Sequence, residues 1–134
     1  PCDDSLDFQI ARLAEKLSAG ARFIQTQPIF EPAKLNKFLK QVKQKKLPKF
    51  PLIAGIMPLS SIKTVDFLNA KVPGITIHEQ IRKRMENKDH KEGFAIALEL
   101  IQELKPMING IHVMAVGLEK ELPTFLHKLQ YLRN

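Results

Sequence analysis

Residues 20–30 place a polar amide at the end of a short apolar run, where α/β proteins keep their binding residues. Gly20 closes a stretch of helical spacing, Phe23 and Ile24 begin a predicted strand, and Gln27 ends it just before a proline. Helix capping explains the glycine and burial explains the apolar residues, but neither explains the amide. Ligand-binding residues of parallel α/β folds gather at the carboxyl ends of strands. Gln27 is therefore the first candidate for a binding residue, because an amide both donates and accepts hydrogen bonds.

The elements that must position Gln27 are predicted by the periodicity of apolar residues. Short apolar runs predict strands near residues 22–27, 52–57 and 110–116, and segments of helical spacing precede, separate and follow them. The run at 52–57 is apolar on both faces, as expected of a parallel strand covered by helices. Two motifs of capping-box type, residues 76–79 and 89–92, predict helix starts. The alternation of helices and strands indicates an α/β fold with parallel strands.

The number of predicted strands suggests part of a larger fold. Three strands are too few to close a barrel, and a free-standing sheet of that size would leave unpaired edges. A complete (β/α)8 barrel takes about 250 residues, and this chain has 134. We therefore predict the C-terminal portion of a (β/α)8 TIM barrel, with residues 1–134 as a single domain that is a fragment of a longer chain. A first residue that is Pro rather than Met favours the same interpretation.

Composition argues against several functional classes. The formal net charge of +7 comes largely from lysines in residues 34–46, for which a solvated helix face is the simplest explanation, with attraction to an anionic ligand as the alternative. The chain has no Trp and one Tyr, so a nucleic-acid partner is not expected. One cysteine, Cys2, and scattered histidines without ligand spacing predict no metal site. The lack of a long apolar run or signal peptide predicts no membrane partner and a cytoplasmic location.

Taken together, these segments resemble the methylenetetrahydrofolate reductase family over nearly the whole chain. No stretch is decisive alone, but their order and spacing are fairly specific. The matching stretches are the Lys-x-x-Ala-Gly-Ala motif within residues 15–21, residues 23–30 around Thr26-Gln27, Ala-Gly-Ile-Met-Pro at 54–58, residues 96–101 and residues 110–114. Residues 110–117 depart from the Tyr-Thr-Leu-Asn type sequence of the classical enzymes. They look more like the acetogen-type branch of anaerobes that use folate-linked one-carbon metabolism.

The resemblance implies a fold, a reaction and a cofactor. The family is a flavin-bearing (β/α)8 barrel that reduces 5,10-methylenetetrahydrofolate to 5-methyltetrahydrofolate in one-carbon metabolism and methionine biosynthesis. The implied cofactor is FAD, with FMN as the alternative. The electron donor stays open between NADH, ferredoxin and a partner subunit.

The resemblance also implies roles for four residues, each with a structural alternative. Gln27 matches a glutamine that binds the pterin of folate, or it serves the loop backbone near Pro28. Lys16 matches a lysine that contacts the flavin, or it is a solvated lysine at a helix end. Thr64 and Leu68 match folate-contacting positions that are commonly Gln and Phe. For Leu68, core packing is an equal explanation, and for Thr64, partial exposure.

Neither a catalytic residue nor a metal ligand is assigned in this sequence. The family's protonating glutamate and its acidic residue near the flavin belong to the N-terminal half, and no carboxylate is expected at a strand end here. His112 is an isolated histidine for which an interior, hydrogen-bonded ring is favoured over a flavin contact. The fragment alone is therefore expected to be inactive.

The partners expected are folate, the N-terminal half of the barrel, an electron-donating subunit and further copies of the chain in a homo-oligomer. The leading alternative function is a non-catalytic assembly or docking module derived from such a barrel, since a truncated barrel exposes apolar edges. A third interpretation is a basic protein that binds anionic ligands in general.

Overall fold

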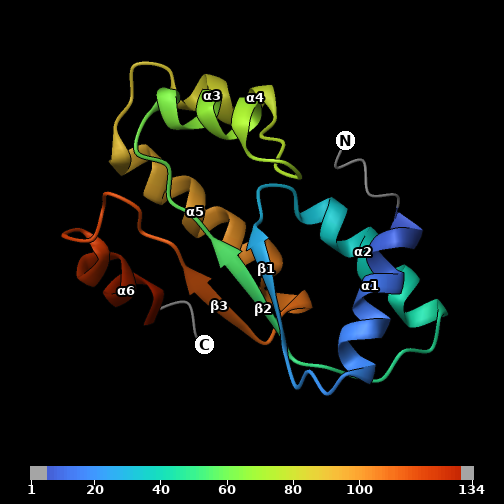
Figure 1. Ribbon diagram of the computed structural model, residues 1–134. Coiled ribbons are helices and arrows are strands. Elements are labelled where there is room, and N and C mark those ends of the chain that lie inside the picture. The colour runs from blue at the N-terminus through green and yellow to red at the C-terminus, as the bar shows by residue number, and fades with distance from the viewer. Residues whose placement is uncertain (1–5, 131–134) are drawn as a thin grey trace.

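The computed structural model describes residues 6–130 of the chain, as an α/β fold (Figure 1). The elements follow one another as α1 (Leu6–Ser18), β1 (Ile24–Pro28), α2 (Pro32–Gln44), β2 (Leu52–Ile56), α3 (Ile62–Lys71), α4 (Glu79–Met85), α5 (His90–Leu104), the short 3-10 helix η1 (Lys105–Met107), β3 (Gly110–Val113) and α6 (Leu122–Gln130). Helices precede, separate and follow the strands, as predicted from the sequence. No helix within this described part is long and apolar enough to cross a membrane.

The strands form one parallel sheet in the order β1-β2-β3. Ile53 pairs with Gln25 on one side and with Gly110 on the other. Parallel neighbours need crossover connections, and α2 supplies the first, while α3, α4 and α5 supply the second. The carboxyl ends of all the strands therefore lie at the same edge of the sheet.

The strand boundaries differ slightly from the predicted ones. The first strand begins at Ile24 and runs through Pro28, so the proline does not end it. A proline is tolerated there because β1 is an edge strand, where a missing N–H costs no ladder hydrogen bond. The third strand ends at Val113 rather than at 116, because the chain turns after the Met114 N–H donates to the carbonyl oxygen of Ile56 at 2.8 Å.

Helices cover one face of the sheet. Leu52, Ala54 and Ile56 of β2 are buried against α2, α5 and α6; in Figure 1, α5 passes behind the strands, with α2 on the right and α6 on the left. Side chains alternate between the faces of a strand, so Gln25, Ile53 and His112 belong to the other face. No described helix packs on that face, and Gln25 and His112 are exposed there.

A second core lies beyond the carboxyl ends of the strands. The short helices α3 and α4 pack on the first half of α5, above the arrowheads in Figure 1. Val65 of α3, Met85 of α4 and Ile96 of α5 are buried together there. At the surface, Arg84 of α4 binds Glu92 and Glu99 of α5 at 2.9 and 2.6 Å. This core holds the connection between α3 and α4 next to the end of β1.

Candidate functional site

The carboxyl end of β1 is distorted by a β-bulge. The register moves from Gln25 opposite Ile53 to Pro28 opposite Gly55, which leaves one extra residue in β1. The Thr26 hydroxyl occupies the gap, because it accepts the Gly55 N–H at 3.0 Å and donates to the Gln27 carbonyl oxygen at 2.7 Å. Bulges commonly redirect a side chain at a functional site. Here the bulge is at Thr26 and Gln27.

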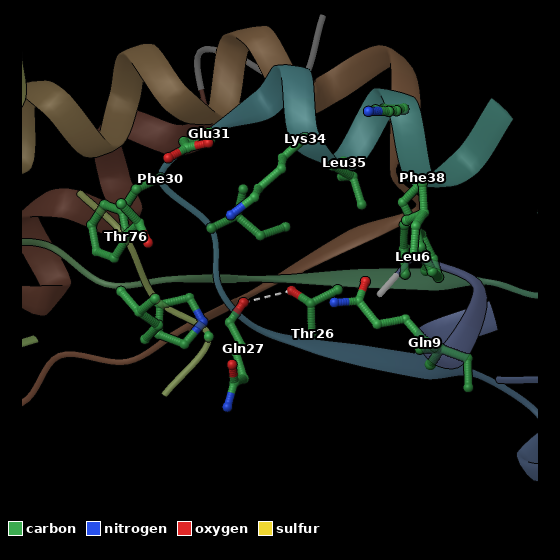
Figure 2. A pocket seen from close by; sticks show the side chains of 17 residues that line it. Leu6, Gln9, Thr26, Gln27, Phe30, Glu31, Lys34, Leu35, Phe38 and Thr76 are labelled. Atoms are coloured by element: carbon green, nitrogen blue, oxygen red, sulfur yellow. Dashed lines mark hydrogen bonds between the residues drawn. The ribbon is translucent and has the colours of Figure 1, made fainter. Parts of the chain in front are cut away.

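A pocket of about 490 Å³ lies beside this bulge, between β1, α1, α2 and the loop that follows α3 (Figure 2). Its apolar wall includes Ile24, Leu35, Phe38 and Leu52. Polar side chains come from all of its other sides, and they are Gln9, Thr26, Gln27, Glu31, Lys34, Lys37 and Thr76. The pocket thus combines an apolar wall with a few polar groups, the usual composition of a small-molecule site.

Gln27 stands at the rim of this pocket. Its side chain is exposed, and Figure 2 shows its amide pointing away from α2. Within residues 6–130 the side-chain amide makes no hydrogen bond, and the short contact drawn to Thr26 belongs to the Gln27 backbone carbonyl. The described backbone near Pro28 therefore gives no support to the structural alternative for this amide.

Charged side chains occupy the α2 side of the pocket. Lys34 extends from α2 into the pocket in Figure 2. Glu31, at the start of α2, also lines the pocket, and its carboxylate lies 3.1 Å from Nε2 of His78. Glu31 is the N-cap residue of α2 and follows β1 by only a short turn, so a carboxylate lies near this strand end; the expectation that no carboxylate here takes a catalytic role stays a prediction. The pairing of Glu31 with His78 connects the start of α2 to the start of α4.

The other residues with predicted roles lie outside this pocket. Leu68 is 5% exposed and packs in the core between α3 and α5. Thr64 is half-buried, and its hydroxyl lies 2.7 Å from that of Ser60. Lys16 is exposed in the last turn of α1, where its carbonyl accepts the N–H of Ala21 just before β1 begins. Lys16 and Gln27 therefore stand at opposite ends of β1.

His112 is not enclosed. It is exposed on the face of the sheet that the described helices leave uncovered, and it makes no hydrogen bond within residues 6–130. The favoured interpretation of a buried, hydrogen-bonded ring was therefore wrong for this part of the chain. No group of three or more His, Cys, Asp or Glu side chains that could hold a metal ion occurs within the same residues.

Sequence reasoning missed the residues that the loop after α3 contributes. Gly74 and Thr76 line the pocket, although they lie far from Gln27 along the chain. The Pro-Gly pair at 73–74 signals a turn, but no periodicity tells which strand end the turn approaches. Lys34 was recognised only as part of a solvated helix face.

Comparisons with known proteins show the fold and the family of the chain. A solved structure of an uncharacterized protein from Clostridium thermocellum that binds two copies of 5-methyl-5,6,7,8-tetrahydrofolic acid shares the fold, with a TM-score of 0.66 and 20% identity. The match covers 92% of this chain and 48% of that one, so the chain spans about half the length of this relative. The family model of methylenetetrahydrofolate reductase matches residues 1–130. The chain therefore belongs to the methylenetetrahydrofolate reductase family.

Proposed function

We propose that the chain is the folate-binding part of a flavin-dependent reductase that converts 5,10-methylenetetrahydrofolate to 5-methyltetrahydrofolate. The observation that carries this proposal is the exposed Gln27 amide, which stands without a hydrogen-bond partner in the described chain at a strand's carboxyl end and a pocket rim. A pterin presents donors and acceptors side by side, and an amide can pair with both. Family membership and the folate bound by the relative from Clostridium thermocellum support the same ligand class.

In the proposed complex, Gln27 orients the pterin at the rim of the pocket. Lys34 contributes positive charge near the ligand. Folates carry carboxylates on their glutamate end, and a lysine that reaches into the pocket suits such a group.

The flavin, FAD or FMN, would supply the hydride that completes the methyl group. The described residues do not form a flavin site by themselves. Lys16 is one exposed cation beside the start of β1, whereas Gln27 is at the other end of the strand. We propose that the N-terminal part of a (β/α)8 barrel supplies most of the flavin site and the general acid. Thr64 and Leu68 are then more easily explained by packing than by folate contact.

The proposal includes assembly with that N-terminal part, an electron donor that is NADH, ferredoxin or a partner subunit, and a cytoplasmic setting. The alternative is a docking module derived from such a barrel, which would associate with a partner and bind neither folate nor flavin. Under both the reductase proposal and the docking-module alternative, the uncovered face of the sheet favours association with a partner.

Replacing Gln27 in the full-length protein tests the folate site. We expect Gln27→Ala to weaken binding of 5-methyltetrahydrofolate by about 1–3 kcal/mol, the value of one or two hydrogen bonds to an otherwise unpaired ligand edge. The matched control is Gln25→Ala, an exposed glutamine on the same strand that does not line the pocket. Calorimetric titration measures the affinity, and visible absorbance reports whether flavin is retained.

Equal folate affinity in the Gln27→Ala and Gln25→Ala proteins would contradict the assignment of Gln27. A wild-type protein that associates with its partner but binds neither folate nor flavin would favour the docking module.

A further inference from the structure

The loop at residues 72–78 connects α3 to α4 and lines the pocket. Side-chain contacts hold it at both of its ends. The side chain of Asn69 accepts the N–H of Ile77 through Oδ1 at 2.7 Å and donates to the carbonyl oxygen of Ile77 through Nδ2 at 3.3 Å. Ile75 and Ile77 are both buried, at 7% and 4% exposure. The residues between Asn69 and Ile77 therefore have little freedom to move away from β1.

A contact between the side chains of Glu31 and His78 lies at the far end of the same loop. Nε2 of His78 lies 3.1 Å from Oε1 of Glu31, the N-cap residue of α2 in the short segment that follows β1. The loop is thus connected to α3 at one end and to the segment that follows Gln27 at the other.

Gly74 is the point at which this loop meets Gln27. Its φ is +84°, a backbone conformation that residues with a side chain rarely adopt. A Cβ built on Gly74 would lie 3.1 Å from Oε1 of Gln27, and no other described residue beyond its chain neighbours comes within 4 Å of it. The absence of a side chain at Gly74 therefore leaves room for the Gln27 amide oxygen, and a methyl group there would be crowded against it.

We propose that Gly74 and Asn69 are positioning residues for the Gln27 amide. Asn69 fixes the loop, and Gly74, which has no side chain, leaves the space that the amide oxygen occupies. A glutamine at an exposed strand end has several rotamers, and contact with a fixed loop reduces their number. The inference rests on the proposed function, in that the positioned amide is the group that would bind the pterin.

The chain offers a matched control for a Gly74→Ala substitution. Gly20 also has a positive φ, +104°, but a Cβ there would have no described residue other than its chain neighbours within 4 Å. Gly20→Ala and Gly74→Ala therefore impose the same kind of backbone strain, while only Gly74→Ala adds an atom against Gln27. Thermal unfolding of both variants measures the shared strain.

The first measurement follows the Gln27 side chain itself, by amide NMR of the chain. Loss of a signal pair in Gln27→Ala identifies the Gln27 NH2 resonances. We expect them to shift in Gly74→Ala and in Asn69→Ala, to shift less in Asn69→Asp, which keeps the acceptor for Ile77, and to stay in place in Gly20→Ala. Unchanged resonances in Gly74→Ala would overturn the proposal whatever the ligand.

The second measurement is the affinity of the full-length protein for 5-methyltetrahydrofolate in a double-mutant cycle. We expect Gly74→Ala to raise the Kd roughly tenfold, the effect of about one misplaced hydrogen bond, and to have no further effect in a Gln27→Ala background. An equal rise in both backgrounds, or a rise no larger than for Gly20→Ala, would overturn the positioning role and leave the proposed function standing. If Gln27→Ala alone leaves the Kd unchanged while the resonances of Gln27 still move in Gly74→Ala, the proposed function fails and the positioning of the amide stands.

Discussion

At the scale of single residues, Gly55 makes room for the bulge that carries Gln27. A Cβ at Gly55 would lie 2.8 Å from the carbonyl oxygen of Thr26, 2.9 Å from that of Gln27 and 2.8 Å from Cε of Met114. The methionine end can move aside, but the carbonyls belong to the backbone of β1. A side chain at this position therefore has to displace the strand that bears the candidate site.

We expect Gly55→Ala to lower the free energy of unfolding by about 1–3 kcal/mol, the usual cost of overpacking. Urea denaturation followed by circular dichroism measures the change. Gly110→Ala is the control, because Gly110 lies in the neighbouring strand and its added Cβ would contact only the Ile53 side chain at 3.9 Å. Equal denaturation midpoints for the two variants would show that the bulge can shift to make room for the methyl group without a loss of stability.

The residue-scale outcome shows what the sequence can and cannot predict about the site. Gln27 was predicted at a strand end, and it does lie there, beside a pocket. Its binding role stays a prediction. The bulge was not predicted, since it depends on the Thr26 hydroxyl bonding to Gly55 of another strand. Gly74 was missed for the same reason, because its role is a tertiary approach to Gln27.

At the scale of elements, an ion pair connects α3 to α4. Nε of Arg82 lies 2.8 Å from Oδ1 of Asp66, and Nη2 lies 3.2 Å from Oδ2, so the guanidinium meets the carboxylate with two nitrogens. Hydrogen bonding to Arg82 lowers the pKa of Asp66 below its ordinary 3.8. Both groups are at the surface, so the pair is a sensitive reporter of the α3–α4 arrangement rather than a large source of stability.

The lowered pKa of Asp66 fixes the sign of its pH dependence. Its contribution to stability is fully present above the unfolded value near 3.8 and is lost as the pH falls through the lower folded value. We expect Arg82→Gln to bring the pKa of Asp66 back toward 3.8, as followed by carboxyl carbon NMR. Glu86→Gln is the control, since Glu86 is 3.8 Å from Arg82 and leaves the Asp66 contact intact. An unchanged Asp66 titration in Arg82→Gln would show that the pair does not form in solution.

The packing of α5 depends on a glycine inside the helix. Gly93 is buried, and a Cβ there would collide with the backbone of Leu59, including its carbonyl oxygen. Gly→Ala in an exposed helix stabilises by about 0.5–1 kcal/mol. We expect the opposite sign for Gly93→Ala, a loss of about 3 kcal/mol or more in thermal or urea unfolding, because a backbone contact has to open. A stabilised variant would mean that α5 can move away from the segment after β2.

The two capping-box motifs show which helix starts a local sequence pattern can predict. Asp89 is the N-cap of α5, as its capping-box motif predicted, and its side chain accepts the N–H of Lys91. Glu92 does not return to the cap, because it binds Arg84 instead. The motif at 76–79 was wrong, since α4 begins at Glu79 with His78 as its N-cap and without a side-chain cap. The residues before His78 form a loop that lines the pocket, and this conformation depends on tertiary packing rather than on the local sequence pattern.

At the scale of the whole molecule, the sheet has one face and two edges that no described helix covers. The pocket beside β1 lies along one edge. A second hollow of about 580 Å³, lined by β3, the end of α5 and α6, lies along the other edge. Strand count and alternation predicted these uncovered edges from the sequence, because three parallel strands cannot close into a barrel. Periodicity alone gave no information about the hollows, which depend on how the helices at each edge diverge.

The uncovered face and edges lead to a prediction about association. Phe23 is 54% exposed just before β1, and parallel edge strands offer unpaired backbone groups to another strand. We expect the chain alone to self-associate in a concentration-dependent way, as measured by sedimentation velocity. Adding the N-terminal part of the proposed barrel should replace these species by a one-to-one complex, because the missing strands cover the same edges.

Two substitutions test which surface associates. Phe23→Ser should weaken self-association, whereas Lys43→Ser, on the exposed side of α2, should not. A chain that stays monomeric and ignores the N-terminal part would contradict the barrel-fragment proposal, since its edges would then need no partner.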